Sequence, residues 1–132
     1  MNLIRNSLLQ ISLTGCLLLI LLSCRKDSEG SDRELPIISL ISPTSNQTVA
    51  GGSAVAIEGT ISDNRKVAEV HVHIYNRSTG ALLIDIHRYP GSTPYDLKES
   101  FQAQGNTNYR IQVIAKDNSA NESRATVEIS SN

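Results

Sequence analysis

Apolar and polar residues alternate with a period of two along most of the chain from Pro36 onward. Within 67–75, Val70, Val72 and Ile74 share one side of an extended chain, and the polar residues between them share the other. No segment after residue 35 keeps an apolar period near 3.6, so the pattern predicts strands rather than helices. The expected strands are 37–42, 54–61, 67–75, 82–89, 95–103, 109–117 and a last one around Ala125, Val127 and Ile129.

Short strands separated by Gly, Asn, Asp and Pro every 8–12 residues are typical of two packed sheets. We therefore predict an all-β fold, a two-sheet sandwich of about seven strands. The segment 95–103 is the least regular, because Glu99 shares its side with Leu97 and Phe101, and we expect a bulge or short break there. The residues expected to form much of the core are Val55, Ile57, Ile61, Val70, Val72, Ile74, Ile111, Val113, Val127 and Ile129.

The segment 105–123 places a tyrosine at the start of a strand, then alternating apolar residues, then Ala-Lys-Asp and a polar loop. This order resembles the F strand and F–G loop of fibronectin type III-like and bacterial immunoglobulin-like domains. The segments 36–43 and 59–64 also match such domains, so the resemblance covers 36–130. It implies an immunoglobulin-like sandwich in which Tyr109 is the tyrosine-corner residue, bonded to nearby backbone. It implies no particular ligand.

The N-terminal region has a different pattern. Arg5 precedes an apolar run over 8–22, which closes in Leu21-Leu22-Ser23-Cys24 and leads directly into charged residues. A membrane-spanning helix needs roughly 20 apolar residues and a stop-transfer flank. The arrangement instead resembles a bacterial lipoprotein signal, which is cut before the cysteine that then receives lipid. We predict a signal peptide over 1–23, a lipidated Cys24 with a flexible tether over 24–35, and the folded domain over 36–132.

The resemblance to a lipoprotein implies that the membrane is a partner through the lipid on Cys24, and that the protein is located in the outer membrane of the cell envelope. The tether includes Lys26-Asp27-Ser28-Glu29, which is similar to the basic-then-acidic export signal of surface lipoproteins in Bacteroidota. An ordinary solubilising linker would have the same composition. Display on the cell surface and a periplasmic location therefore both stay open.

The composition limits which classes of function the chain can have. A formal net charge of −1 gives no electrostatic case for nucleic-acid binding. Cys16 leaves with the signal and Cys24 carries lipid, so packing alone must stabilise the domain. Tyr75, Tyr89 and Tyr95 suggest a patch for a protein or glycan, although a chain with no tryptophan is poorly suited to stacking on sugars.

Motifs for catalysis are missing from the sequence: it has no phosphate-binding glycine loop, Gly-x-Ser-x-Gly, Cys-x-x-Cys or His-Glu-x-x-His. We expect a non-catalytic, lipid-anchored cell-envelope module for adhesion or scaffolding, with no required cofactor and an unidentified protein or glycan partner. The alternative is a metal-binding lipoprotein that holds zinc or calcium.

Two groups of residues carry the metal alternative. His71 and His73 share the outer side of one strand. A hairpin turn near Ser78 or Thr79 would place Asp85 and His87 opposite them, close enough to share one cation such as zinc. A polar strand face has the same residue types without a metal. For calcium, loop oxygens would converge at one end of the sandwich, although loop Asp and Asn also form Asx turns. The candidate calcium residues are Asp63, Asn64, Asp117, Asn118 and Asn121.

Overall fold

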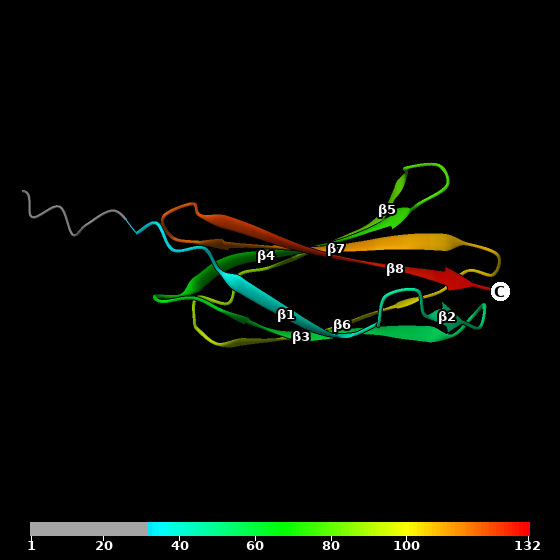
Figure 1. Ribbon diagram of the computed structural model, residues 1–132, viewed down its shortest axis with the longest axis horizontal. Coiled ribbons are helices and arrows are strands. Elements are labelled where there is room, and N and C mark those ends of the chain that lie inside the picture. Colours follow the sequence, from blue (N-terminus) through cyan, green and yellow to red (C-terminus); the bar gives the residue numbers. More distant parts are fainter. Residues whose placement is uncertain (1–31) are drawn as a thin grey trace, which may run out of the picture. The chain divides into compact units, whose positions relative to one another are not determined.

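The computed structural model describes residues 32–132, which form two layers of mostly antiparallel strands packed face to face (Figure 1). The predicted signal peptide, Cys24 and most of the tether lie outside the described residues. Within the described part, no helix is long and apolar enough to cross a membrane. The prediction of an all-β, two-sheet immunoglobulin-like sandwich is confirmed.

One sheet has three strands in the order β1-β3-β6, and the other has five in the order β2-β8-β7-β4-β5. The small sheet consists of β1 (Ile37–Ser42), β3 (Ala54–Ser62) and β6 (Tyr95–Gln102). The large sheet consists of β2 (Thr48–Val49), β4 (Val67–Asn76), β5 (Leu82–Arg88), β7 (Asn108–Asp117) and β8 (Glu122–Ser131). All seven predicted strands are present, and β2 is an addition. Two residues are too few to show an alternation, and β2 exists through parallel pairing with the end of β8.

The core lies between the sheets and consists of the apolar members of each alternating strand. Every residue of the predicted core is buried, and Ile57, Val72 and Ile111 have no exposed surface. Burial of a side chain of this size contributes roughly 1.5–3 kcal/mol relative to leaving it in water. Tyr109 is 1% exposed, and its hydroxyl accepts a hydrogen bond of 2.6 Å from the backbone N–H of Gln104. The phenol thereby ties the start of β7 to the loop before it.

The prediction of a bulge or short break in the 95–103 segment is wrong. β6 pairs with β3 without interruption from Ile61↔Tyr95 to Ala54↔Gln102. The Glu99 side chain can point inward because the guanidinium of Arg88, on β5, pairs with its carboxylate. Arg88 Nε lies 2.8 Å from Glu99 Oε1, and Arg88 Nη2 lies 2.9 Å from Glu99 Oε2. β5 and β6 are edge strands of different sheets, so this two-pronged ion pair closes one side of the sandwich.

Replacement of Arg88 by Met should leave the Glu99 carboxylate, only 11% exposed, without its partner. We expect a loss of about 1–3 kcal/mol in the free energy of unfolding, measured by urea denaturation. The double variant Arg88→Met/Glu99→Met should recover most of that loss, because an apolar pair leaves no charge unpaired. Equal stability of the wild type and the single variant would show that the pair has no structural role.

Candidate functional site

The first predicted group of residues lies on the outer face of the β4–β5 hairpin. The strand register sets His71 opposite His87 and His73 opposite Asp85. These four side chains point away from the core, because Val72 and its neighbours of the same parity point into it. The structure therefore brings together all four residues named for zinc. We call them, together with Glu69, the histidine cluster.

Glu69 was not among the predicted ligands, although it lies two residues before His71 on the same face of β4. Its Oε1 lies 2.6 Å from Nε2 of His71. The same period of two that paired His71 with His73 would have identified it. A single glutamate on an outer strand face is ordinary, however, and is no signal for metal binding by itself.

The contacts within the histidine cluster are close. Asp85 Oδ1 lies 3.2 Å from Nε2 of His73 and 2.9 Å from Nε2 of His87. The rings of His71 and His87 have centroids 4.0 Å apart. In a set formed by His71, His73 and Asp85, ligand atoms lie within 4.8 Å of one another, and the same holds for a set formed by Glu69, His71 and His87. The two sets share His71.

Burial differs across the histidine cluster. The side chain of His71 is 14% exposed and that of His73 is 19% exposed, whereas Asp85 and His87 are about two-fifths exposed. Ile114 of β7 lies beside His71 in the register and is itself buried on this outer face. The cluster thus has an apolar wall toward β7 and an open side along β5.

Neighbouring groups act on the cluster's charges and ring orientations. The His71 imidazole beside Glu69 lowers the pKa of that carboxyl below its ordinary value, and contact with His87 does the same for the pKa of Asp85. The hydroxyl of Tyr75 lies 3.2 Å from Nδ1 of His73, which leaves Nε2 of that ring directed at Asp85. Arg110 lies over the Tyr75 ring at 4.8 Å from its centroid.

The second predicted group, the calcium candidates, converges at the end of the sandwich where the described chain begins. Carboxylate oxygens of Asp32, Asp63 and Asp117 lie within 4.8 Å of one another. Asp32 was expected in the flexible tether, yet it is buried and belongs to the compact unit Asp32–Asn132. Sequence alone gave no signal for this, because the segment around Asp32 has no periodicity.

Hydrogen bonds explain why Asp32 is ordered. The side-chain amide of Asn121 donates to the Asp32 carbonyl at 3.0 Å and to Asp117 Oδ2 at 2.6 Å. The side-chain amide of Asn64 donates to Asp32 Oδ1 at 3.1 Å, and Arg65 Nε lies 3.3 Å from Asp32 Oδ2. Two loops therefore hold the segment that enters the sandwich.

The remaining carboxylate oxygens mostly cap turns. Asp117 Oδ1 accepts from the backbone N–H groups of Ser119 and Asn121, and Asp63 Oδ1 accepts from those of Arg65 and Lys66. These are Asx turns, the structural role that such residues commonly have in loops. Asn118, the fifth calcium candidate, is exposed and makes no hydrogen bond within the described residues of this group.

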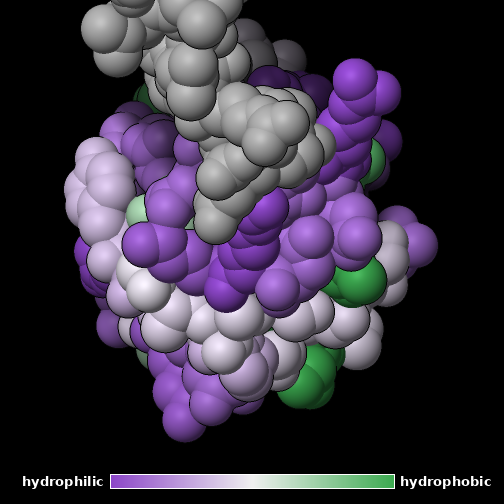
Figure 2. Space-filling view, turned by 90° about the vertical axis from the view of Figure 1, so that its left-hand side faces the viewer, coloured by the Kyte–Doolittle hydropathy of each residue, from purple (hydrophilic) through white to green (hydrophobic). Residues whose placement is uncertain are grey.

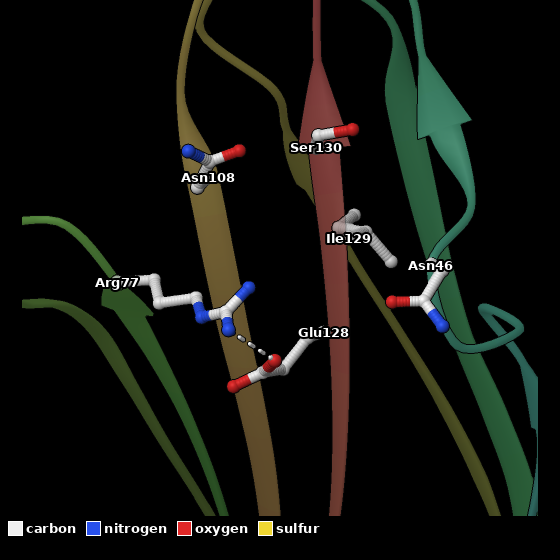
Figure 3. Close-up of a pocket in the computed structure, with 6 residues that line it drawn as sticks. All are labelled: Asn46, Arg77, Asn108, Glu128, Ile129 and Ser130. Atoms are coloured by element: carbon white, nitrogen blue, oxygen red, sulfur yellow. Dashed lines mark ion pairs between the residues drawn. The ribbon is translucent and has the colours of Figure 1, made fainter.

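A small hollow lies at the opposite end of β8, between the strand and the loop at Asn46 (Figure 3). Its volume is about 200 Å³, below the 300–1,000 Å³ of usual small-molecule sites. An ion pair between Arg77 Nη2 and Glu128 Oε2, 3.1 Å long, occupies its side. The lining residues are Asn46, Arg77, Asn108, Glu128, Ile129 and Ser130.

The contacts of Asp32 make stability depend on pH in a defined direction. The hydrogen bond from Asn64, then the backbone N–H of Glu34 and the Arg65 charge, hold the pKa of Asp32 below its ordinary value. A carboxyl whose pKa is lowered on folding stabilises the fold above about pH 4, and that stabilisation is lost as pH falls toward the lowered pKa. Unfolding free energies of the wild type should therefore decline between about pH 5 and pH 2.

The variant Asp32→Asn should be less stable at neutral pH and should show a shallower acid decline, measured by urea denaturation from pH 2 to 6. The matched control is Asp96→Asn, at an exposed position of β6 that leaves the contacts of Asp32 intact. An acid decline of equal slope in the wild type and Asp32→Asn would contradict the assignment.

The fold is similar to solved structures with other sequences. A superoxide reductase (neelaredoxin) from Ignicoccus hospitalis matches with a TM-score of 0.52 at 13% identity, over 75% of this chain and 81% of that chain. Fibronectin(III)-like modules of CbhA from Clostridium thermocellum match with a TM-score of 0.52 at 24% identity, over 74% of this chain. This chain spans 47% of the CbhA chain. At these identities the likenesses show the fold alone.

Comparison of the amino-acid sequence identifies a family but no individual curated protein. No curated protein sequence matches this chain. The family described as "Domain of unknown function (DUF4625)" matches residues 22–116, which include most strands of both sheets and all residues of the histidine cluster. With the greater part of its length covered, the chain belongs to the DUF4625 family.

Proposed function

We propose that this protein is a non-catalytic binding module for adhesion or scaffolding, held at the outer membrane of the cell envelope by lipid on Cys24. Its sandwich fold is shared with the fibronectin(III)-like modules of CbhA, at 24% identity. Folds of this kind carry many functions, so the proposal rests on the surface of this chain.

The observation that carries the proposal is the exposure of large apolar side chains along two edge strands. On β1, Ile37 is 65% exposed and Ile41 is 69% exposed. Leu82 and Leu83 begin β5 and are also exposed. Figure 2, seen from the end where β1 begins, shows green apolar patches standing out from a mostly purple and white surface. Pairs of large apolar side chains exposed on one strand, as on β1 and on β5, are the kind of surface that contact with a partner would cover.

Edge strands also offer unpaired backbone groups, which makes them suited to contact with another chain. β1 is the edge of the small sheet and β5 is an edge of the large one. The hollow beside β8 is small and polar, so it supports a small-molecule site poorly. A protein partner fits such a surface better than a substrate.

The lipid anchor is supported by the order of residues at the N-terminus: an apolar run ends in Leu-Leu-Ser before Cys24, and polar residues follow at once. The match to the family includes Cys24. After cleavage, a lipid on this cysteine would hold the domain close to the membrane, since the seven residues before Asp32 reach at most ~25 Å when extended.

The variant Cys24→Ser tests the anchor, because serine has no thiol to receive lipid. We expect loss of radiolabelled palmitate from the protein and its release from the membrane fraction in the native host. The matched control is Ser23→Ala, which should keep both. Labelling that persists in Cys24→Ser would remove the lipid anchor from the proposal.

The binding surface is tested with a photo-crosslinking amino acid at Ile41 or Leu83 in living cells. We expect a discrete adduct of one size from at least one position, because these side chains are proposed to lie within an interface. Thr126, an exposed residue in the middle of β8, is the control position and should give no such adduct. No adduct from either apolar edge, or the same adducts from all three positions, would contradict a specific binding surface.

A further inference from the structure

We propose that the histidine cluster on the outer face of the β4–β5 hairpin is a binding site for one zinc-class divalent transition metal ion. His71 is the central ligand, accompanied by His73 and Asp85 on one side and by Glu69 and His87 on the other. The site is separate from the apolar edge of β1 but shares β5 with Leu82 and Leu83, and zinc binding by the isolated chain does not depend on the proposed binding function.

The composition of the cluster is unusual for this chain. The whole sequence holds three histidines, and all three lie in the cluster. They are joined by Glu69 and Asp85, so the group presents three imidazoles and two carboxylates. Imidazole nitrogen with carboxylate oxygen is the donor set of zinc and related borderline metals, whereas calcium and magnesium prefer oxygen alone.

The distances suit a metal. Zinc bonds of about 2.0–2.2 Å to nitrogen and oxygen place the ligand atoms of a tetrahedral site about 3.3–3.5 Å apart. The separations from Asp85 Oδ1 are 3.2 Å to His73 Nε2 and 2.9 Å to His87 Nε2. Within each set the ligand atoms lie within 4.8 Å of one another, so side-chain rotation would have to bring the more distant atoms to the zinc spacing.

His71 supplies a second, independent observation. Its Nε2 is buried and makes no hydrogen bond within the described part of the chain, although Glu69 Oε1 lies only 2.6 Å away. The buried ring nitrogen thus lies beside a carboxylate oxygen without an aligned hydrogen bond, and a metal ion would bridge the two groups. A buried polar atom without a partner is costly, and coordination of a metal ion would satisfy it.

The surroundings hold the ligands in place and leave a route for the ion. Adjacent strands fix the ligand backbones, and the Tyr75 hydroxyl lies at the far nitrogen of His73, as partners of metal-binding histidines commonly do. Ile114 shields His71 on the side of β7. Asp85 and His87 are about two-fifths exposed and line the open side.

The test uses the chain from Arg25 onward, which includes the whole compact unit Asp32–Asn132, carries no added histidines and contains no cysteine. Zinc is titrated into metal-stripped protein, and binding is followed by calorimetry and by the imidazole NMR signals. We expect one zinc per chain and shifts of the imidazole signals. At a hundredfold excess of zinc over Kd, the thermal midpoint should rise by about 10 °C or more.

Variants locate the ion. His71→Ala removes the ligand shared by both sets and should weaken zinc binding by at least about 100-fold, more than loss of an outer-shell partner does. Asp85→Asn changes a partly exposed side chain without changing its shape, so the fold should be unaffected. It should also weaken zinc binding, and it therefore tests the site even if His71→Ala perturbs the fold. Gln112→Ala, opposite His73 on β7, is the matched control and should bind like the wild type.

The proposal is overturned if zinc neither binds nor raises the midpoint, or if it binds equally to the wild type, His71→Ala and Asp85→Asn. It is also overturned if calcium raises the midpoint and zinc does not, because that result would place the ion among oxygen ligands.

Discussion

The structure depends on the burial of one face of each long strand between the two sheets. The cysteines of the chain both precede the described residues, so no disulfide supports this domain and apolar packing must supply its stability. β4 and β7 contribute most clearly, because their inward residues Val72 and Ile111 are completely buried. The core therefore sets the register of the strands that carry the candidate site.

Register links the core to the histidine cluster. Side chains of a strand alternate strictly, so a shift of β5 by one residue against β4 would turn Asp85 and His87 toward the core and expose Ile84 and Ile86. Exposure of these apolar side chains to water would cost free energy. Burial of the core therefore fixes the positions of the cluster residues, without any contribution from contacts within the cluster. A site on the hairpin of inner strand β4 and edge strand β5 is in this way positioned by packing, and its ligands remain free to meet an ion.

Polar groups close the sandwich where apolar packing ends. The Arg88–Glu99 pair joins the edge strands of the two sheets, and the contacts of Asp32 join the entering chain to two loops. Both arrangements place a carboxylate in a poorly solvated position and satisfy it from a different strand or loop. These contacts leave the exposed edge of β1 and the outer face of β5 as surfaces open to other molecules.

The alternation of apolar residues was sufficient to predict the all-β fold, seven of the eight strands, the core and the shared face of His71, His73, Asp85 and His87. It was sufficient because a period of two is a local property of a strand. β2, the regular pairing of β6, the burial of Asp32 and the approach of Glu69 to His71 were decided only by the tertiary structure. In the first three cases the stabilising partner belongs to another element: β8 for β2, Arg88 of β5 for Glu99, and Asn121 for Asp32. For Glu69 the neighbour is close in sequence, but only the packing of β4 between β5 and β7 sets how the two side chains meet.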